Sequence, residues 1–166
     1  MKNNRIHMKT VTDNKTVPEI EKKSILLVED DFFVRDIYQR KLVEMGFDVH
    51  TASDGLEGMA RLQESIPDIV LLDIFMPYMD GRDLLREMKA NPLWKDIPVI
   101  LLTNFSASEG VHDGFDLGAD EYLIKSHFTP SEVTSKINAV FEERKKNDIL
   151  NAAETDPETS EKKKDE

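Results

Sequence analysis

The sequence contains no cysteine and no long apolar run. Without thiols the chain cannot form disulfides, thiolate zinc sites or iron–sulfur clusters, and it cannot use a cysteine nucleophile. No apolar run approaches the roughly 18 residues needed to cross a bilayer, and the N-terminal segment lacks the apolar stretch of a secretory signal. These absences lead us to expect a cytoplasmic protein without a membrane anchor.

Positive charge is also scarce, since 22 basic side chains face 33 acidic ones and the net charge is -11 over 166 residues. Nucleic-acid backbones and anionic membranes attract proteins with excess positive charge. We therefore expect neither direct nucleic-acid binding nor membrane binding. The length suits one domain that can bury a core of its own.

Composition divides the chain into three parts. Residues 1–23 and 145–166 are rich in polar and charged side chains and hold few apolar ones. Such segments stay disordered because they cannot bury enough apolar surface to offset the conformational entropy lost on folding. We predict one folded domain at 24–144 between two disordered tails.

Within the predicted domain, short apolar runs alternate with amphipathic stretches. Four runs are typical of strands buried on both faces, and a fifth alternates apolar and polar residues as an edge strand does. The runs are 25–28, 69–72, 99–102 and 122–124, and the alternating segment is 47–52. Helical patterns lie between the strands, and a capping box at Thr129–Glu132 predicts the start of the last helix. The pattern predicts a (βα)5 domain with a parallel sheet between two helical layers.

Charged and hydroxyl side chains follow the predicted strands at the points where they end. In chain order they are Glu29, Asp30, Asp31, Asp73, Thr103 and Lys125. Because ligands of parallel sheets bind at the carboxyl ends of the strands, we expect these side chains to surround one pocket.

Carboxylates gathered in one pocket repel each other unless a cation lies between them. Oxygen ligands without cysteine or histidine favour Mg²⁺, with Mn²⁺ as the substitute. Asp73 could then attack phosphorus and form an aspartyl phosphate, with Thr103 and Lys125 binding the phosphoryl oxygens. Taken singly these residues have plainer explanations, because Asp31 could simply cap the next helix. Their occurrence together favours a site.

Four segments resemble the receiver domain of bacterial two-component response regulators. They are ILLVEDDFFVRDIYQRKLVEMGF, PDIVLLDIFMPYMDG, IPVILLTNFS and GADEYLIKSHFTPSEV. They occur in the order of the family and cover residues 24–144. The resemblance implies a flavodoxin-like three-layer sandwich with the sheet order 2-1-3-4-5.

The resemblance also implies how the domain works. Asp73 would accept a phosphoryl group from a phosphohistidine on a sensor histidine kinase or phosphotransfer protein. Mg²⁺ would be bound directly by Asp30, by Asp73 and by the backbone carbonyl of Phe75, while Glu29 would act through a metal-bound water.

Three further residues have roles implied by the family. Thr103 and Lys125 would contact the phosphoryl group, and Tyr122 would be the aromatic residue that changes position on activation. Two positions depart from the family pattern, because Ser126 replaces the usual proline after the lysine and Asn104 replaces a small residue after the threonine.

The C-terminal segment has no helix-turn-helix pattern, so we expect a stand-alone receiver without a DNA-binding output domain. It would not be an enzyme beyond its own phosphorylation and dephosphorylation. Its fourth helix, expected at 106–118, would form with the fifth strand and fifth helix a face that contacts an unidentified downstream protein or a second copy in a phosphorylation-dependent homodimer.

Other functions of similar folds fit the sequence less well. Flavodoxin-type electron carriers need a phosphate-binding loop after the first strand, where Glu29, Asp30 and Asp31 would repel a phosphate. No GxGxxG segment follows that strand either, which disfavours a Rossmann dehydrogenase. The alternative is a phosphatase of the haloacid-dehalogenase type, which needs two aspartates one residue apart, whereas Asp30 and Asp31 are adjacent.

Overall fold

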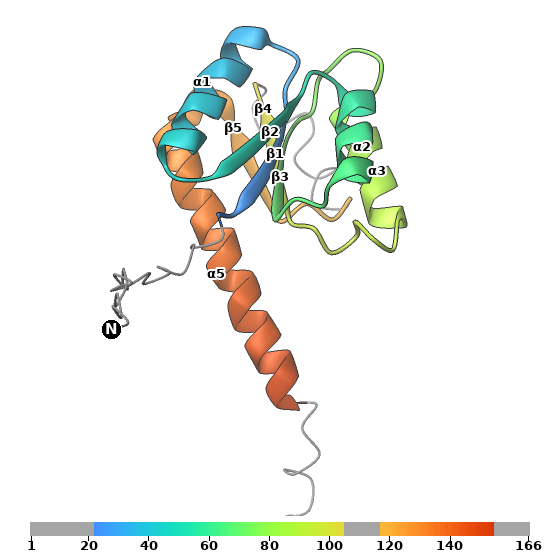
Figure 1. Cartoon of the computed structure of the whole chain (residues 1–166), viewed down its shortest axis with the longest axis vertical. Helices are drawn as coiled ribbons and strands as arrows, with labels where there is room; N and C mark the ends of the chain where they lie inside the picture. Colours follow the sequence, from blue (N-terminus) through green and yellow to red (C-terminus); the bar gives the residue numbers. More distant parts are fainter. Residues whose placement is uncertain (1–21, 105–116, 155–166) are drawn as a thin grey trace, which may run out of the picture.

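The computed structural model describes residues 22–104 and 117–154. In this part of the chain, five parallel strands form one sheet (Figure 1), and their order is β2-β1-β3-β4-β5. The strands are β1 (Ser24–Val28), β2 (Asp48–Ala52), β3 (Ile69–Asp73), β4 (Val99–Thr103) and β5 (Glu121–Ile124). The predicted sheet order is confirmed, and each predicted strand lies within one residue of the observed one.

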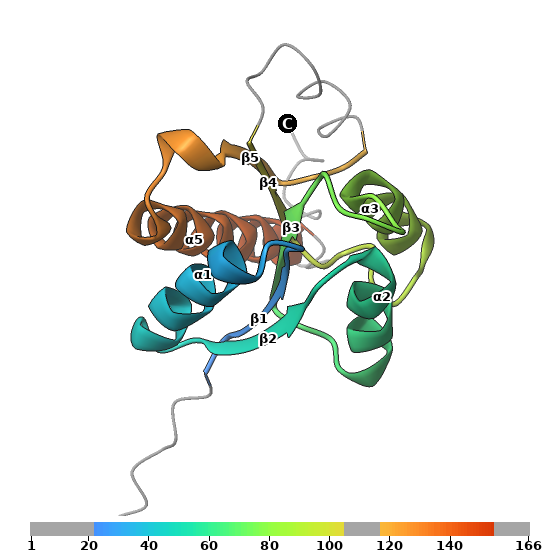
Figure 2. The ribbon, with the colours of Figure 1, turned by 90° about the horizontal axis from the view of Figure 1, so that it is seen from above.

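Helices cover both faces of the sheet. They are α1 (Phe32–Glu44), α2 (Gly55–Glu64), α3 (Gly81–Ala90) and α5 (Pro130–Glu154), together with a short 3-10 helix η1 (Lys125–His127). Figure 2 shows α1 and α5 on one face and α2 and α3 on the other. The predicted three-layer sandwich is therefore confirmed.

The residues of β1 show why both faces are covered. Ile25 and Leu27 contribute to the core beneath α1 and α5, whereas Leu26 and Val28 contribute to the core beneath α2 and α3. Successive side chains of a strand point to opposite faces, so a strand buried on both faces must be apolar throughout.

Hydrogen bonds at the helix starts explain where two helices begin. Asp31 precedes α1 and accepts from Phe33 N at 2.8 Å and from Val34 N at 3.0 Å. Thr129 and Glu132 form the predicted capping box at α5, because Glu132 Oε2 accepts from Thr129 N at 2.7 Å. The capping explanation of Asp31 is thus the one that the structure supports.

The C-terminal helix corrects one prediction. α5 continues to Glu154 and projects away from the sheet (Figure 1), so the prediction of disorder is wrong for residues 145–154. The sequence argument relied on apolar periodicity, which is missing where a helix faces solvent on all sides. Helical propensity and growth from an existing helix need no such periodicity. Residues 155–166 and 1–21 lie outside the described part.

One further prediction lies outside the part of the chain that the structure describes. The expected fourth helix at 106–118 falls almost wholly on residues that the structure does not describe. The peptide bond between Lys125 and Ser126 is trans. None of the described helices is both long and apolar enough to span a membrane.

Candidate functional site

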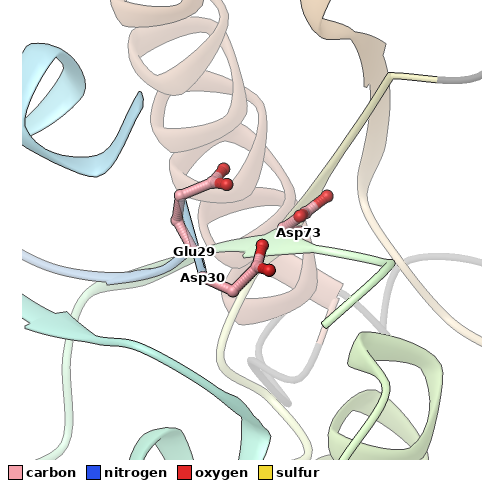
Figure 3. A group of neighbouring side chains, drawn as sticks. All are labelled: Glu29, Asp30 and Asp73. Atoms are coloured by element: carbon pink, nitrogen blue, oxygen red, sulfur yellow. The ribbon is translucent and has the colours of Figure 1, made fainter. Parts of the chain in front are cut away.

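The carboxyl ends of β1 and β3 bring three acidic side chains together. Val28 pairs with Leu72, so Glu29 and Asp73 lie at the same level of adjacent strands. Asp30 follows in the loop before α1. Figure 3 shows the carboxylates of Glu29, Asp30 and Asp73 converging from these strand ends.

The three carboxylates are close enough to share one ion. Glu29, Asp30 and Asp73 each offer an oxygen atom, and these atoms all lie within 4.8 Å of one another. Glu29 is 1% exposed and Asp73 is 4% exposed, whereas Asp30 is open to solvent. The cluster thus consists of two buried carboxylates and one carboxylate that is open to solvent.

Lys125 follows β5 and reaches across to the same cluster. Its Nζ forms an ion pair with Glu29 Oε2 and lies 3.3 Å from Asp73 Oδ1. The Lys125 side chain is 7% exposed, so water screens these charges little. The ammonium group thus pairs with two of the three carboxylates, and the side chains of the cluster carry more negative than positive charge.

Excess negative charge and burial together change the acidity of Asp73. Burial raises the pKa of Asp73 to about 6, and the ammonium group of Lys125 opposes that rise. The charges of Glu29 and Asp30 add to the rise, so the value of about 6 is the net result of burial and these three neighbouring charges. At neutral pH the Asp73 carboxylate is thus ionised but poorly compensated, and a bound cation would stabilise it.

A tight loop after β3 fixes the backbone next to Asp73. Gly81 N donates to Ile74 O at 2.8 Å, so the loop folds back on itself before α3 begins. A Cβ atom at position 81 would lie 2.0 Å from Asp73 O, which no side chain permits. Glycine at 81 therefore lets the start of α3 approach the strand end that carries Asp73.

The other predicted site residues lie around this cluster. Thr103 ends β4, the strand next to β3, and is fully buried. Phe75 follows Asp73 in the loop and is 44% exposed, with the Arg82 guanidinium 5.5 Å from its ring centre. Tyr122 is half-buried on β5 and packs against the core beneath α2 and α3. The roles of Thr103, Phe75 and Tyr122 stay predictions.

Sequence reasoning missed two residues that shape the site. Gly81 was not singled out, although a glycine after the aspartate of a strand-to-helix loop is a signal for close backbone approach. Arg35 was also missed. It donates to the backbone carbonyl oxygens of Glu29 and Asp30, and contacts with backbone atoms leave no pattern of residue types in a sequence.

Known proteins resemble this chain in both structure and sequence. A crystal structure of the chemotaxis protein CheY4 of Vibrio cholerae superposes with a TM-score of 0.68 and 28% identity, covering 72% of this chain and 98% of that one. The Mn²⁺-bound form of response regulator Rcp1 superposes with a TM-score of 0.60 and 35% identity, covering 66% of this chain and 85% of that one.

Curated relatives extend the comparison to longer proteins. A probable transcriptional regulator, ycf27 of Cyanophora paradoxa, is 36% identical over 140 residues, which are 84% of this chain and 56% of that protein. The chain thus spans about half the length of the curated relatives that it matches. The sequence model of the response regulator receiver domain matches residues 25–138. The chain belongs to the family of response regulator receiver domains in two-component signalling.

Proposed function

We propose that Asp73 accepts a phosphoryl group from a phosphohistidine on a sensor histidine kinase or a phosphotransfer protein. The observation that carries this proposal is the convergence of Glu29, Asp30 and Asp73 beside the buried ammonium group of Lys125. Such a site attracts a divalent cation and retains one positive side chain for a phosphoryl group.

The residues present fit a hard divalent cation. Carboxylate oxygens are the preferred ligands of Mg²⁺, which is held in phosphoryl-transfer sites by one or two carboxylates and keeps bound waters. Asp30 and Asp73 would hold the ion directly, Glu29 through a water, and the Phe75 backbone carbonyl would complete the protein ligands. Mn²⁺ would substitute, and the Mn²⁺-bound form of the related Rcp1 supports this. The bound ion would offset negative charge on the transferring phosphoryl group.

The chemical step requires an ionised Asp73. With a pKa of about 6, its carboxylate is mostly deprotonated at pH 7 and can act as the nucleophile. A carboxylate oxygen would form a bond to phosphorus while the phosphorus–nitrogen bond of the phosphohistidine breaks. The leaving imidazole keeps the electron pair and takes up a proton. Lys125 and Thr103 would then bind oxygens of the new phosphoryl group.

An apolar surface beside the site would receive the donor protein. A cavity of about 310 Å³ opens next to Lys125 between α1 and the start of α5. Its lining residues are Val34, Ile37, Tyr38, Asn104, Lys125, Ser126, Phe128 and Pro130. Exposed aromatic and aliphatic groups typically mark protein contacts, and Phe33 is 76% and Ile37 56% exposed.

Phosphorylation would change a second contact surface, which includes β5 and α5. Tyr122 would move within β5 and alter the contact with a downstream protein or with a second copy of the chain. We further propose that the domain catalyses only its own phosphorylation and dephosphorylation. The phosphatase alternative predicts rapid, repeated turnover of p-nitrophenyl phosphate, whereas a receiver should show no turnover beyond the slow rate of its own dephosphorylation.

The test of the phosphoacceptor is a mass measurement. Incubation with acetyl phosphate and Mg²⁺ should add one phosphoryl group to the intact protein, and Asp73→Asn or EDTA should abolish the adduct. Asp31→Asn is the matched control, because asparagine also caps helices and the residue is not part of the cluster. An adduct that persists in Asp73→Asn would refute the assignment.

A further inference from the structure

Arg35 lies in the first turn of α1, and its side chain turns back toward the loop before the helix. Its Nη1 donates to two consecutive backbone carbonyl oxygens, at 2.5 Å to Glu29 and at 3.3 Å to Asp30. The guanidinium carbon lies 5.8 Å from the centre of the Phe32 ring. A half-buried arginine is thus fixed beside the acidic cluster.

The segment that Arg35 holds belongs to neither a strand nor a helix. β1 ends at Val28 and α1 begins at Phe32. Glu29 N donates to Ala52 O at 3.0 Å, which fixes one side of this segment to β2. The guanidinium of Arg35 fixes it through the two carbonyl oxygens. Hydrogen bonds from a charged donor are stronger than neutral ones, so this contact restricts the segment effectively.

Asp30 depends on this restriction more than its neighbours do. The Glu29 carboxylate is held by Lys125 and by Asp31 N, which donates to Oε1 at 3.3 Å. Asp73 Oδ1 accepts from Ile74 N at 2.9 Å. Within the described residues, no comparable donor holds the exposed Asp30 carboxylate. The backbone of Asp30 therefore determines whether its carboxylate points at the cluster.

The atoms that accept hydrogen bonds from Arg35 also determine which oxygen atoms remain available to a cation. Arg35 bonds to carbonyl oxygens, and in the described part of the chain it forms no ion pair with Glu29, Asp30 or Asp73. An arginine that paired with the Asp30 carboxylate would occupy the oxygen atoms that a cation needs. Bonding to the backbone instead orients the carboxylate and leaves those oxygen atoms available.

We propose that Arg35 is a positioning residue for the cation site, which itself rests on the proposed function. It holds the backbone of Glu29 and Asp30 so that the Asp30 carboxylate faces Asp73 before any ion binds. It is not a ligand. Residues that orient ligands typically change metal affinity by roughly 10- to 100-fold when they are replaced.

Charge alone predicts the opposite result, which makes the proposal testable. A guanidinium near a cation site repels the incoming ion, so its removal would strengthen binding if Arg35 acted only as a charge. Loss of positioning would weaken binding. The sign of the change in Mg²⁺ affinity therefore distinguishes the two effects.

The experiment is a calorimetric titration of the full chain with Mg²⁺. We expect Arg35→Gln to weaken Mg²⁺ binding roughly tenfold. Arg35→Lys keeps the charge but lacks the planar guanidinium, so its affinity should be intermediate. Arg40→Gln and Arg40→Lys are the matched controls, because Arg40 lies on the same helix and pairs with the Asp36 side chain at 2.9 Å. Their affinities should equal that of the wild type.

Thermal unfolding in EDTA separates positioning from stability. A purely structural Arg35 would lower the unfolding temperature of its variants while leaving their Mg²⁺ affinity unchanged, and that result would overturn the proposal. Equal or tighter binding by Arg35→Gln would overturn it as well. If Arg35→Gln does not fold, an Arg35→Lys variant that binds Mg²⁺ as tightly as the wild type would overturn the proposal. Absence of binding by the wild type would instead refute the cation site, and the inference with it.

Discussion

Asp68 and Asp120 directly precede β3 and β5 at the amino end of the sheet, while Glu29 and Asp73 lie at its carboxyl end. At the amino end each carboxylate has its own cation. Asp68 Oδ1 accepts from Lys23 Nζ at 2.7 Å, and Asp120 forms an ion pair with Arg144. Backbone groups add to both, because Asp68 accepts from Ser24 N at 2.7 Å and Asp120 from Val99 N at 2.9 Å.

At the carboxyl end Glu29 and Asp73 share the ammonium group of Lys125, and Asp30 adds a third carboxylate to the cluster. The acidities differ accordingly. Burial pushes the pKa of Asp68 upward, but the hydrogen bonds from Lys23 and Ser24 outweigh it and hold that pKa below its ordinary value. The pKa of Asp73 is raised to about 6. The same residue type is thus stabilised as an anion at one end and destabilised at the other.

This difference shows which acidic residues stabilise the fold and which require a ligand. A paired carboxylate that also accepts backbone hydrogen bonds connects strands and helices. A buried carboxylate with too little positive charge costs stability, and the cost is recovered when a cation binds the folded state alone. Undercompensated charge is therefore a better guide to the functional end of this sheet than the presence of acidic residues.

The largest expected effect is on the free energy of unfolding, when one negative charge is removed at either end of the sheet. In EDTA at pH 7, Asp73→Asn should raise the free energy of unfolding by on the order of 2–3 kcal/mol, because a buried, poorly compensated charge is lost. Asp68→Asn should lower it by about 1 kcal/mol, because Lys23 loses its partner at a partly exposed site. Urea unfolding followed by fluorescence of Trp94, the single tryptophan, measures both.

Saturating Mg²⁺ serves as the control for this contrast. The ion should stabilise the wild type and reduce the advantage of Asp73→Asn, while leaving the effect of Asp68→Asn unchanged. If Asp73→Asn instead destabilises the protein in EDTA, the negative charge at the carboxyl end is compensated and the comparison between the two ends fails.

The sequence predicted the sheet and its functional end well because both depend on residue type. Uninterrupted apolar runs such as 69–72 have few alternatives to a strand buried on both faces. Carboxylates at the ends of such runs, Asp30 and Asp73 among them, must then meet at one end of a parallel sheet.

Features that depend on backbone contacts or on exposed helix could not be predicted in this way. The carbonyl oxygens bonded by Arg35 belong to every residue type, and the backbone atom that Gly81 approaches is set by the fold of the loop. Asp31 could have been a ligand or a cap, and only the position of the α1 start decides this. The outer part of α5 lacks the apolar stripe on which helix prediction relies.

Removal of the Lys125 ammonium group should change the Mg²⁺ affinity, and this change tests the comparison between the two ends of the sheet. Lys125 and a divalent cation compete for the same oxygen atoms of Glu29 and Asp73. We expect Lys125→Met to tighten Mg²⁺ binding about tenfold at pH 8, which is well above the Asp73 pKa of about 6. Arg144→Met, which removes a cation from the amino end, should leave the affinity unchanged. Calorimetric titration measures both, and weaker binding by Lys125→Met would show that the lysine assists the ion.

The smallest expected effect is a dependence of stability on pH at the carboxyl end. The pKa of Asp73 in the folded protein, about 6, lies above its ordinary value of 3.8. Between these values the folded state binds a proton that the unfolded state releases, so this group contributes stability at low pH and loses it as pH rises through 6. In EDTA the wild type should gain about 1 kcal/mol relative to Asp73→Asn between pH 7 and pH 5.

The contribution of Asp68 at the amino end should not change with pH in this range. Because the pKa of Asp68 is lowered, its contribution is present above the pKa of the unfolded chain and is lost only as pH falls through the folded value. The difference between wild type and Asp68→Asn should thus stay constant from pH 7 to pH 5. Urea unfolding at pH 5, 6 and 7 measures both differences. A wild type that gains nothing over Asp73→Asn in this range would mean that the Asp73 carboxylate is not destabilised in the folded protein.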